Sequence, residues 1–346
     1  MTYPQLNSNS STRPHGLPPV VRKALASLLA LAILLALADA ALHFGLGLGN
    51  PVLIAPDAAC GYIMKPNQRV FRFFVHTYIN PYGMRSADFQ PVKPPHTYRV
   101  LFVGDSITYG TTRIDQSQIF TQLLDRSLPT VMHQPVEVLN ASASAWAIDN
   151  ELSFVRSRGI FQSNVVMLVL NSGDLSQTRA KMPDVNDDLP FHKPASALNE
   201  LYERLIRPYF LHLHRRFDAG DSTSQVNGQV IRANIAYLDS FRALVESQHA
   251  RFVIVYAPIR KEIPTISSRS AILLHAWCAA HRVPLLDLTS VEAEYKSSQI
   301  TLEGVHFNTF GNRVVADAIL KDWPRFVLHS APDAAPAQQP ASAARP

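Results

Sequence analysis

The chain has 346 residues and a formal net charge of +5; 47% of its residues are hydrophobic and 17% are charged. This composition suits a globular core together with an apolar segment, and it excludes a chain that is largely disordered. The positive charge is spread out, without a run of five Lys or Arg, so we expect no nucleic-acid partner.

Residues 1–19 are polar and are predicted to be a disordered cytoplasmic lead. The next segment, 20–48, is almost entirely apolar, with Arg22 and Lys23 near its start and one aspartate near its end. About 20 apolar residues span a bilayer, so we predict a transmembrane signal anchor here. A cleavable signal peptide is the alternative, because Ala38-Asp39-Ala40 has the small-x-small pattern of a cleavage site. Under either interpretation the basic flank stays in the cytoplasm and the rest of the chain is exported.

A proline-rich lead-in, 49–97, separates the apolar segment from the main domain. Within it, 70–79 is rich in residues that favour strands, and it lies between proline- and asparagine-containing turns. We therefore expect a small β hairpin, or edge strands, packed on the main domain.

Strand-like and helix-like patterns alternate through the main domain, 98–328. Strands are predicted at 99–103, 136–140, 164–170, 252–257 and 284–288, and helices at 116–127, 147–158, 229–248, 268–281 and 308–323. A long irregular segment, 176–227, contains a possible helix at 196–215, and the Ala/Pro/Gln-rich tail, 329–346, is predicted to be disordered. Five apolar strands alternating with helices indicate an α/β fold with a parallel, doubly wound, flavodoxin-like sheet.

The first strand of this domain runs into Gly104-Asp105-Ser106, where a buried strand ends in a glycine turn. Ser106 is expected at the carboxyl edge of the sheet, where open α/β folds bind ligands. Near the other end of the domain, Glu303 precedes His306 by three residues. Serine is a weak nucleophile that needs a neutral imidazole as base, and the imidazole needs a carboxylate to orient it. We therefore predict Ser106 as nucleophile, His306 as general base and Glu303 as orienting acid. A serine that merely caps a helix is the alternative.

In these residues the chain resembles the SGNH/GDSL hydrolase superfamily of esterases, lipases and carbohydrate acetylesterases. The resemblance covers about 98–325, with Gly-Asp-Ser-Ile-Thr-Tyr-Gly as the first block and Glu-Gly-Val-His as the last. The intermediate blocks correspond to 140–146 and 171–174. The lead-in also resembles membrane-anchored members, through Gly61-Tyr62, Lys65-Pro66-Asn67 and an Asn-x-x-Gly-x-Arg pattern that ends at Arg85. The resemblance implies a three-layer α/β/α fold around a five-stranded parallel sheet.

Three departures from the family pattern concern the oxyanion hole and the acid. Ser142 stands for a glycine whose backbone N–H is a donor, and a serine keeps that N–H. Gly173 stands for an asparagine donor, so we predict that the Asn171 amide reaches the hole from two residues earlier. Glu303 stands for an aspartate and is one methylene longer. The predicted oxyanion donors are therefore Ser106, Ser142 and Asn171.

Other polar and aromatic residues have structural interpretations. Asp105 and Asp174 are predicted to support their loops, and Glu151 to be a solvated helix residue. Trp146 either forms a platform for a sugar ring or belongs to the core. Two cysteines, Cys60 and Cys278, are too few for a disulfide scaffold or a cysteine zinc site, and whether they pair stays open.

The resemblance implies a bacterial, single-pass, inner-membrane esterase that faces the periplasm and removes O-acyl groups, chiefly O-acetyl, from an exopolysaccharide such as cellulose. No metal or other cofactor is expected. Possible partners are polysaccharide synthase or export machinery, or a membrane acyltransferase. Two alternatives stay open: an O-acyltransferase that uses the same triad, and a non-catalytic polysaccharide-binding accessory protein.

Overall fold

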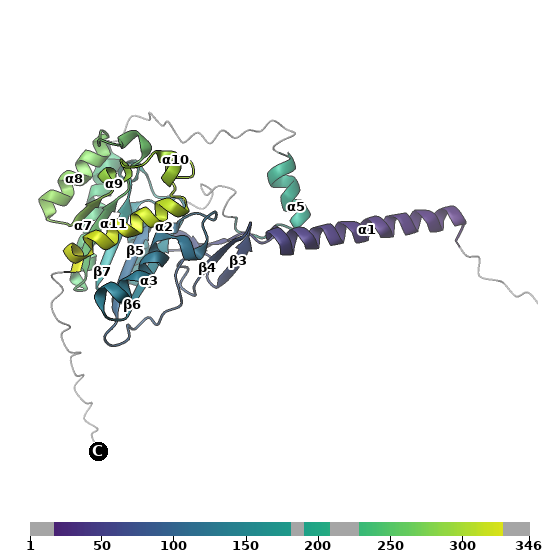
Figure 1. The fold of residues 1–346 in the computed structure, drawn as a ribbon, viewed down its shortest axis with the longest axis horizontal. Coiled ribbons are helices and arrows are strands. Elements are labelled where there is room, and N and C mark those ends of the chain that lie inside the picture. Colours follow the sequence, from purple (N-terminus) through teal and green to yellow (C-terminus); the bar gives the residue numbers. More distant parts are fainter. Residues whose placement is uncertain (1–16, 181–189, 208–227, 328–346) are drawn as a thin grey trace, which may run out of the picture.

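A five-stranded parallel sheet forms the centre of the molecule, in the order β6-β5-β7-β8-β9 (Figure 1). The computed structural model describes residues 17–180, 190–207 and 228–327. The strands are β5 Tyr98–Gly104, β6 Val136–Ser142, β7 Val165–Leu170, β8 Arg251–Tyr256 and β9 Leu285–Asp287. Numbered within the domain this order is 2-1-3-4-5, which is the flavodoxin-like arrangement. The predicted fold class is confirmed.

Helices cover both faces of the sheet, because alternate residues of each strand point to opposite sides. On β5, Val100 and Phe102 pack toward α3 and α11, whereas Leu101 and Val103 face the layer that contains α4, α7 and α8. Burial on both faces explains why the strands read as continuous apolar runs. The flanking helices are α3 Phe120–Met132, α4 Ile148–Arg158, α7 Gly228–Ser247, α8 Arg269–His281 and α11 Thr309–Val327.

Some element boundaries differ from the prediction. The helix expected at 116–127 is a 3-10 turn, η1 Gln116–Gln118, followed by α3, because Ile119 between them is extended with ψ at 145°. The last helix continues to Val327, beyond the predicted end, since Phe326 is buried against the sheet. Further short elements of the domain are α2 Ser106–Tyr109, η2 Asp174–Ser176, η5 Arg260–Glu262, α9 Thr289–Glu292 and α10 Ser297–Ile300.

The segment predicted as a helix at 196–215 is described only in part. It begins as α5 Ala197–Leu201, in which Ser196 caps the first turn, and continues as the π-helical turn η4 Tyr202–Ile206. The rest of that prediction lies outside the described residues, as do most of the predicted lead, 1–19, and the predicted tail, 329–346.

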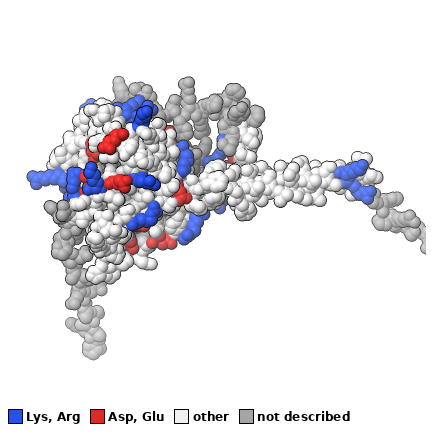
Figure 2. Space-filling model, viewed as in Figure 1, with Lys and Arg blue, Asp and Glu red and all other residues white. Residues whose placement is uncertain are grey.

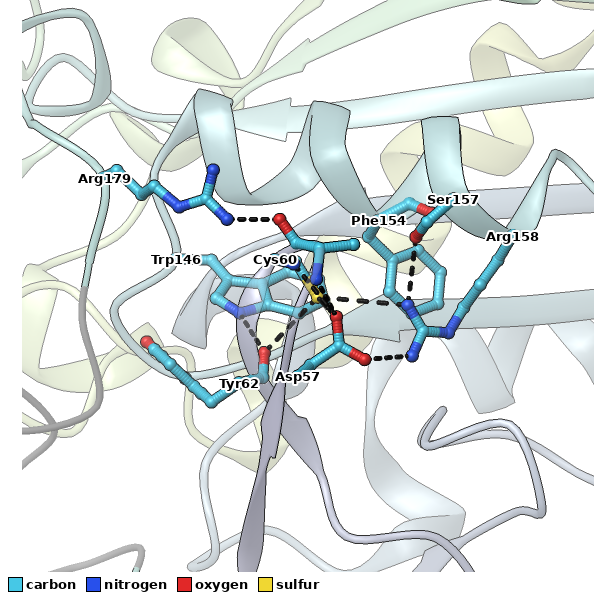
Figure 3. A network of polar contacts seen from close by, with 9 residues as sticks. Asp57, Cys60, Tyr62, Trp146, Phe154, Ser157, Arg158 and Arg179 are labelled. Atoms are coloured by element: carbon cyan, nitrogen blue, oxygen red, sulfur yellow. Dashed lines mark hydrogen bonds and ion pairs between the residues drawn. The ribbon is translucent and has the colours of Figure 1, made fainter.

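The lead-in forms two antiparallel ribbons. The predicted hairpin is present as β3 Gln68–Arg72 paired with β4 Val75–Ile79. A second ribbon, β1 Ile54–Asp57 with β2 Gly61–Met64, was not predicted. Figure 3 shows how this second ribbon is bound near α4: Arg158 donates to Asp57 at 2.5 Å, and the Trp146 indole N–H donates to the carbonyl of Tyr62 at 3.0 Å. Trp146 is therefore a core residue, and the sugar-platform interpretation is wrong.

The two cysteines are both free and buried. The Cys60 thiol donates to Asp57 at 3.0 Å (Figure 3), and burial raises the pKa of Cys60 to about 12. Burial also raises the pKa of Cys278 to about 12. Both side chains act as small, unreactive core residues.

Helix α1, Pro19–Leu46, extends away from the domain (Figure 1) and exposes most of its leucines. By length and composition it can cross a membrane, and a signal sequence near an N-terminus has the same properties. Figure 2 shows this helix free of charged residues along most of its length, with basic residues at its far end, where Arg22 and Lys23 lie. Near the domain, the Leu198 N–H of α5 donates to Asp39 of α1 at 2.8 Å.

Candidate active site

The turn after β5 places Ser106 at the carboxyl edge of the sheet. Gly104 is required there, because a Cβ atom at this position would lie 2.1 Å from Oγ1 of Thr108. The Asp105 carboxylate accepts the Ile107 N–H at 2.8 Å and so caps the short helix α2. Ser106 is the first residue of that helix, and its side chain is only partly buried.

A closed loop between α10 and α11 carries the other two predicted residues. Thr301 and Phe307 pair across the base of this loop, and Phe307 is buried beneath it. Gly304 has φ +91°, a conformation that a side chain rarely adopts. The resulting turn brings Glu303 and His306 together, three residues apart in the chain.

The structure assembles Ser106, His306 and Glu303 into a continuous relay. Nε2 of His306 lies 2.9 Å from Oγ of Ser106, and Nδ1 of His306 contacts Oε1 of Glu303. In this geometry the Glu303 carboxylate accepts a hydrogen bond from the Nδ1–H group of His306. The other ring nitrogen, Nε2, is then free to accept the serine proton. The Glu303 side chain is 38% exposed, so water reaches the acid end of the relay.

Sequence reasoning missed Arg113, which contacts the acid of this relay. Its Nη2 atom donates to both carboxylate oxygens of Glu303 at 2.9 Å, although the arginine side chain is 59% exposed. The contact restrains the Glu303 carboxylate, whose Oε1 atom also contacts His306. No spacing rule pointed to this residue, since it lies in a loop whose path depends on the tertiary structure.

The loop that carries Arg113 is held by Arg85 of the lead-in. The Arg85 guanidinium is fully buried and donates to the carbonyls of Tyr109 at 2.8 Å, Thr111 at 2.6 Å and Ile114 at 2.5 Å. It also lies 4.9 Å from the centre of the Tyr109 ring. Arg85, the last residue of the Asn-x-x-Gly-x-Arg pattern, thus acts as a brace that stabilises segment 109–114, which follows Ser106.

The end of β6 lies beside the nucleophile turn, with Ser142 in register with Gly104. The Ser142 hydroxyl donates to Asn140, whose amide donates to the carbonyl of Thr108 at 2.8 Å. Ser142 is an extended strand residue, whereas Ala145 in the next loop has φ +62°. The backbone position that favours glycine in this block is therefore Ala145, three residues after the one assigned from the sequence.

The side-chain amide of Asn171 contacts two buried carboxyl groups, those of Asp105 and Asp174. Its amide donates to Asp174 at 3.0 Å and lies 3.4 Å from Asp105, and its backbone N–H donates to Asp174 at 2.7 Å. A role as oxyanion donor would require the Asn171 amide to leave one of these carboxyl groups. Both aspartates occupy the positions expected of loop supports.

Glu151 of α4 is a third buried acid near this pair, and the prediction that it is solvated was wrong. Its Oε2 atom is buried without a hydrogen-bond partner. Burial raises the pKa of Glu151 well above its usual value, and the charges of Asp174 and Asp105 add to the effect. Burial raises the pKa of Asp105 to about 6 and raises that of Asp174 well above its ordinary range. Burial and the charges of the neighbouring acids thus both disfavour the charged forms of Asp174 and Glu151.

Within the described residues, no group of three or more His, Cys, Asp or Glu is arranged to hold a metal ion. The arrangement instead brings a serine hydroxyl, an imidazole and a carboxylate into hydrogen-bond contact, a combination that can carry out acyl transfer from an ester.

No protein-family model matches the chain, and no curated protein matches it. Among solved structures, it is similar to a two-domain esterase active on acetylated mannans, with 11% identity, a TM-score of 0.45 and coverage of 68% of this chain and 51% of that one. A lipase/acylhydrolase from Enterococcus faecalis gives 16% identity, a TM-score of 0.41 and coverage of 65% and 94%. A catalytic mutant of an acetylxylan esterase from Geobacillus stearothermophilus gives 12% identity, a TM-score of 0.41 and coverage of 67% and 96%. The chain thus spans about half the length of the first of these proteins.

Proposed function

We propose that this chain is a serine esterase that removes O-acyl groups, chiefly O-acetyl, from an exopolysaccharide such as cellulose. The observation that carries the proposal is the relay in which His306 lies 2.9 Å from the Ser106 hydroxyl and also contacts Glu303. A serine that only capped a helix would not need an oriented imidazole beside it.

In the proposed reaction, Oγ of Ser106 attacks the ester carbonyl while His306 takes the serine proton. The tetrahedral intermediate collapses, the sugar oxygen leaves with the proton from His306, and an acyl-serine remains. Water, deprotonated by His306, then attacks the acyl-serine and releases the carboxylic acid and the free serine. Glu303 holds the imidazole and stabilises its cation during both steps.

The proposed oxyanion donors are the backbone N–H groups of Ser106 and Ser142, which come from the adjacent ends of β5 and β6. Asn171 remains a candidate third donor if its amide turns away from Asp105. Asp105 and Asp174 are proposed to support the loops that hold these groups.

We further propose that α1 anchors the chain in a bacterial inner membrane and that the domain faces the periplasm. Arg22 and Lys23 precede the apolar run, which favours a cytoplasmic N-terminus. This location would place the site beside machinery that makes or exports a polysaccharide, or beside a membrane acyltransferase that supplies acetyl groups.

The test uses the purified full chain in a mild detergent with p-nitrophenyl acetate and, separately, with acetylated cellulose oligosaccharides. We expect release of nitrophenol and acetate by the wild type, and a loss of at least about 10³-fold in Ser106→Ala. Ser247→Ala, at an exposed serine in the last turn of α7, is the matched control and should be as active as the wild type.

Equal rates in the wild type and Ser106→Ala would refute the enzyme and favour a polysaccharide-binding role. A Ser106-dependent reaction that places acetyl on a glycan acceptor, without free acetate, would identify an O-acyltransferase instead. Both readouts come from the same samples.

A further inference from the structure

A cavity of about 450 Å³ opens at the amino edge of the sheet, the edge opposite Ser106. Its wall includes the first residues of two strands, Arg251 of β8 and Leu285 of β9, so the sheet fixes its place in the fold. Small-molecule sites in proteins have volumes of roughly 300–1,000 Å³, and this cavity falls in that range. Residues that line it include Arg251, His275, Cys278, Arg282, Leu285 and Arg325.

The wall of this cavity is positively charged. Three of the residues that line it are arginines, and none is Asp or Glu. Two nearby acids are already paired, since Asp287 contacts His275 at 2.9 Å and Asp322 contacts Arg325. In the described part of the chain, the guanidinium groups of the other two arginines have neither a hydrogen-bond partner nor an ion-pair partner. The cavity therefore keeps two cations that no described side chain neutralises.

Those two arginines are Arg251 and Arg282, and the fold does not explain the position of the first. The Nη1 atom of Arg251 is buried and lacks a hydrogen-bond partner among residues 17–180, 190–207 and 228–327. A buried donor without a partner is costly, and such a group in a native protein can mark a bound ion, ligand or water. Arg282 follows the end of α8, where cations are favoured, but a helix end carries only about half a negative charge. Neither cation is neutralised by the elements around it.

Two unpaired guanidinium groups match an anion that carries two charges. A phosphate monoester has a charge of roughly −1.5 to −2 at neutral pH, whereas a carboxylate has a single charge. Guanidinium groups also bind phosphate oxygens through paired hydrogen bonds. The apolar part of the wall, which includes Cys278, Val283 and Leu285, suits an organic group attached to the phosphate.

We propose that this cavity binds a phosphate monoester, with Arg251 and Arg282 on the phosphate oxygens and the organic group against the apolar wall. Helix α8, which forms part of the wall, lies far from α1 (Figure 1), so the ligand is a soluble compound rather than a lipid headgroup. The cavity and Ser106 lie at opposite edges of the sheet, and the inference does not depend on the proposed esterase activity.

The test uses the purified full chain in a mild detergent and a phosphate-free buffer, with phenyl phosphate as the probe in isothermal titration calorimetry. We expect one site, and an affinity at least about tenfold lower in Arg251→Met and in Arg282→Gln, because each variant loses a charge-assisted contact. Arg260→Gln is the matched control, since Arg260 is an exposed arginine of η5, beyond the carboxyl end of β8. This variant should bind phenyl phosphate as the wild type does.

Two further probes test the class of ligand. Benzoate keeps the ring but carries one charge, so it should bind at least about tenfold more weakly than phenyl phosphate; equal affinity would overturn the phosphoryl assignment. Detergent micelles that contain phosphatidic acid present the same phosphate monoester on a lipid. Tighter binding to these micelles, lost in Arg251→Met, would identify a headgroup and overturn the assignment of a soluble ligand.

Other outcomes would overturn the inference as a whole. One is the absence of binding at millimolar phenyl phosphate. Another is a loss of affinity in Arg260→Gln or in Ser106→Ala, with Arg251→Met unaffected, because it would place the probe at the carboxyl edge. Ser106→Ala should bind phenyl phosphate like the wild type, so the esterase proposal and this one can fail separately.

Thermal unfolding without ligand separates binding from folding. The Arg251 guanidinium has no partner in the described residues, so Arg251→Met should melt at the same temperature as the wild type or above it. A marked loss of stability would show that Arg251 serves the fold. Arg282→Gln, at an exposed residue, would then decide the question, and full affinity in that variant would overturn the inference.

Discussion

The pH dependence of stability should report on the buried acid directly before the nucleophile. Exclusion of water raises the pKa of Asp105 from 3.8 to about 6, although the Ile107 N–H and His306 act in the opposite direction. Because its folded-state pKa is raised, the folded chain holds this proton more tightly than the unfolded chain does. The resulting stabilisation is complete below the unfolded pKa and is lost as pH rises through about 6. A difference of about 2 pK units corresponds to about 3 kcal/mol.

Asp105→Asn removes this titration while keeping a side-chain oxygen for the cap of α2. Denaturant unfolding of both proteins in detergent can be followed by the fluorescence of three buried tryptophans, Trp146, Trp277 and Trp323. Between about pH 4 and about pH 7, the free energy of unfolding of the wild type should fall relative to the variant by about 2.4 kcal/mol, because the stabilisation is not yet complete at pH 4. Titrations of groups away from this cluster cancel in this difference, whereas the pKa values of Asp174 and Glu151 should be lower in the variant, because the charge of Asp105 raises them. Parallel pH curves for the two proteins would refute the reasoning.

Three further substitutions test the site with p-nitrophenyl acetate turnover and thermal unfolding. Glu303→Gln should lower kcat by about two to four orders of magnitude, because an amide can donate to Nδ1 of His306 and so favour the tautomer that cannot accept the serine proton; an unchanged kcat would exclude Glu303 as orienting acid. Arg113→Ala should lower kcat by no more than about five-fold, since an exposed ion pair contributes about 0.2–1 kcal/mol; a loss beyond 100-fold would instead indicate contact with substrate. Arg85→Met leaves three carbonyls without their partner and should lower the free energy of unfolding by at least about 3 kcal/mol, and a melting temperature like that of the wild type would contradict the bracing role.

Much of the fold could be predicted because its central strands are buried on both faces. Such strands appear as short, continuous apolar runs, and the alternation with helices then limits the topology. The β1–β2 ribbon was missed because each of its strands has only four residues and one of them contains Pro56. Strands that short carry no readable periodicity.

The site was predictable where chemistry depends on residue type and local spacing. Glu303 and His306 are three residues apart, and Ser106 follows a strand end, so their meeting follows from the topology. Glu151 was misplaced because a carboxylate in a helix is normally solvated, and only tertiary packing shows it buried near two other acids. Arg113 reaches Glu303 across 190 residues, a contact that no local pattern contains.

The brace formed by Arg85 has a practical consequence for expressing the domain without α1. A truncation at residue 98, where the first central strand begins, would remove the cation that holds the carbonyls of Tyr109, Thr111 and Ile114. It would also uncover the surface of α4 that the β1–β2 ribbon covers (Figure 3). Expression for crystallography or screening should therefore start just after α1, so that both ribbons are kept with the five-stranded sheet and its helices.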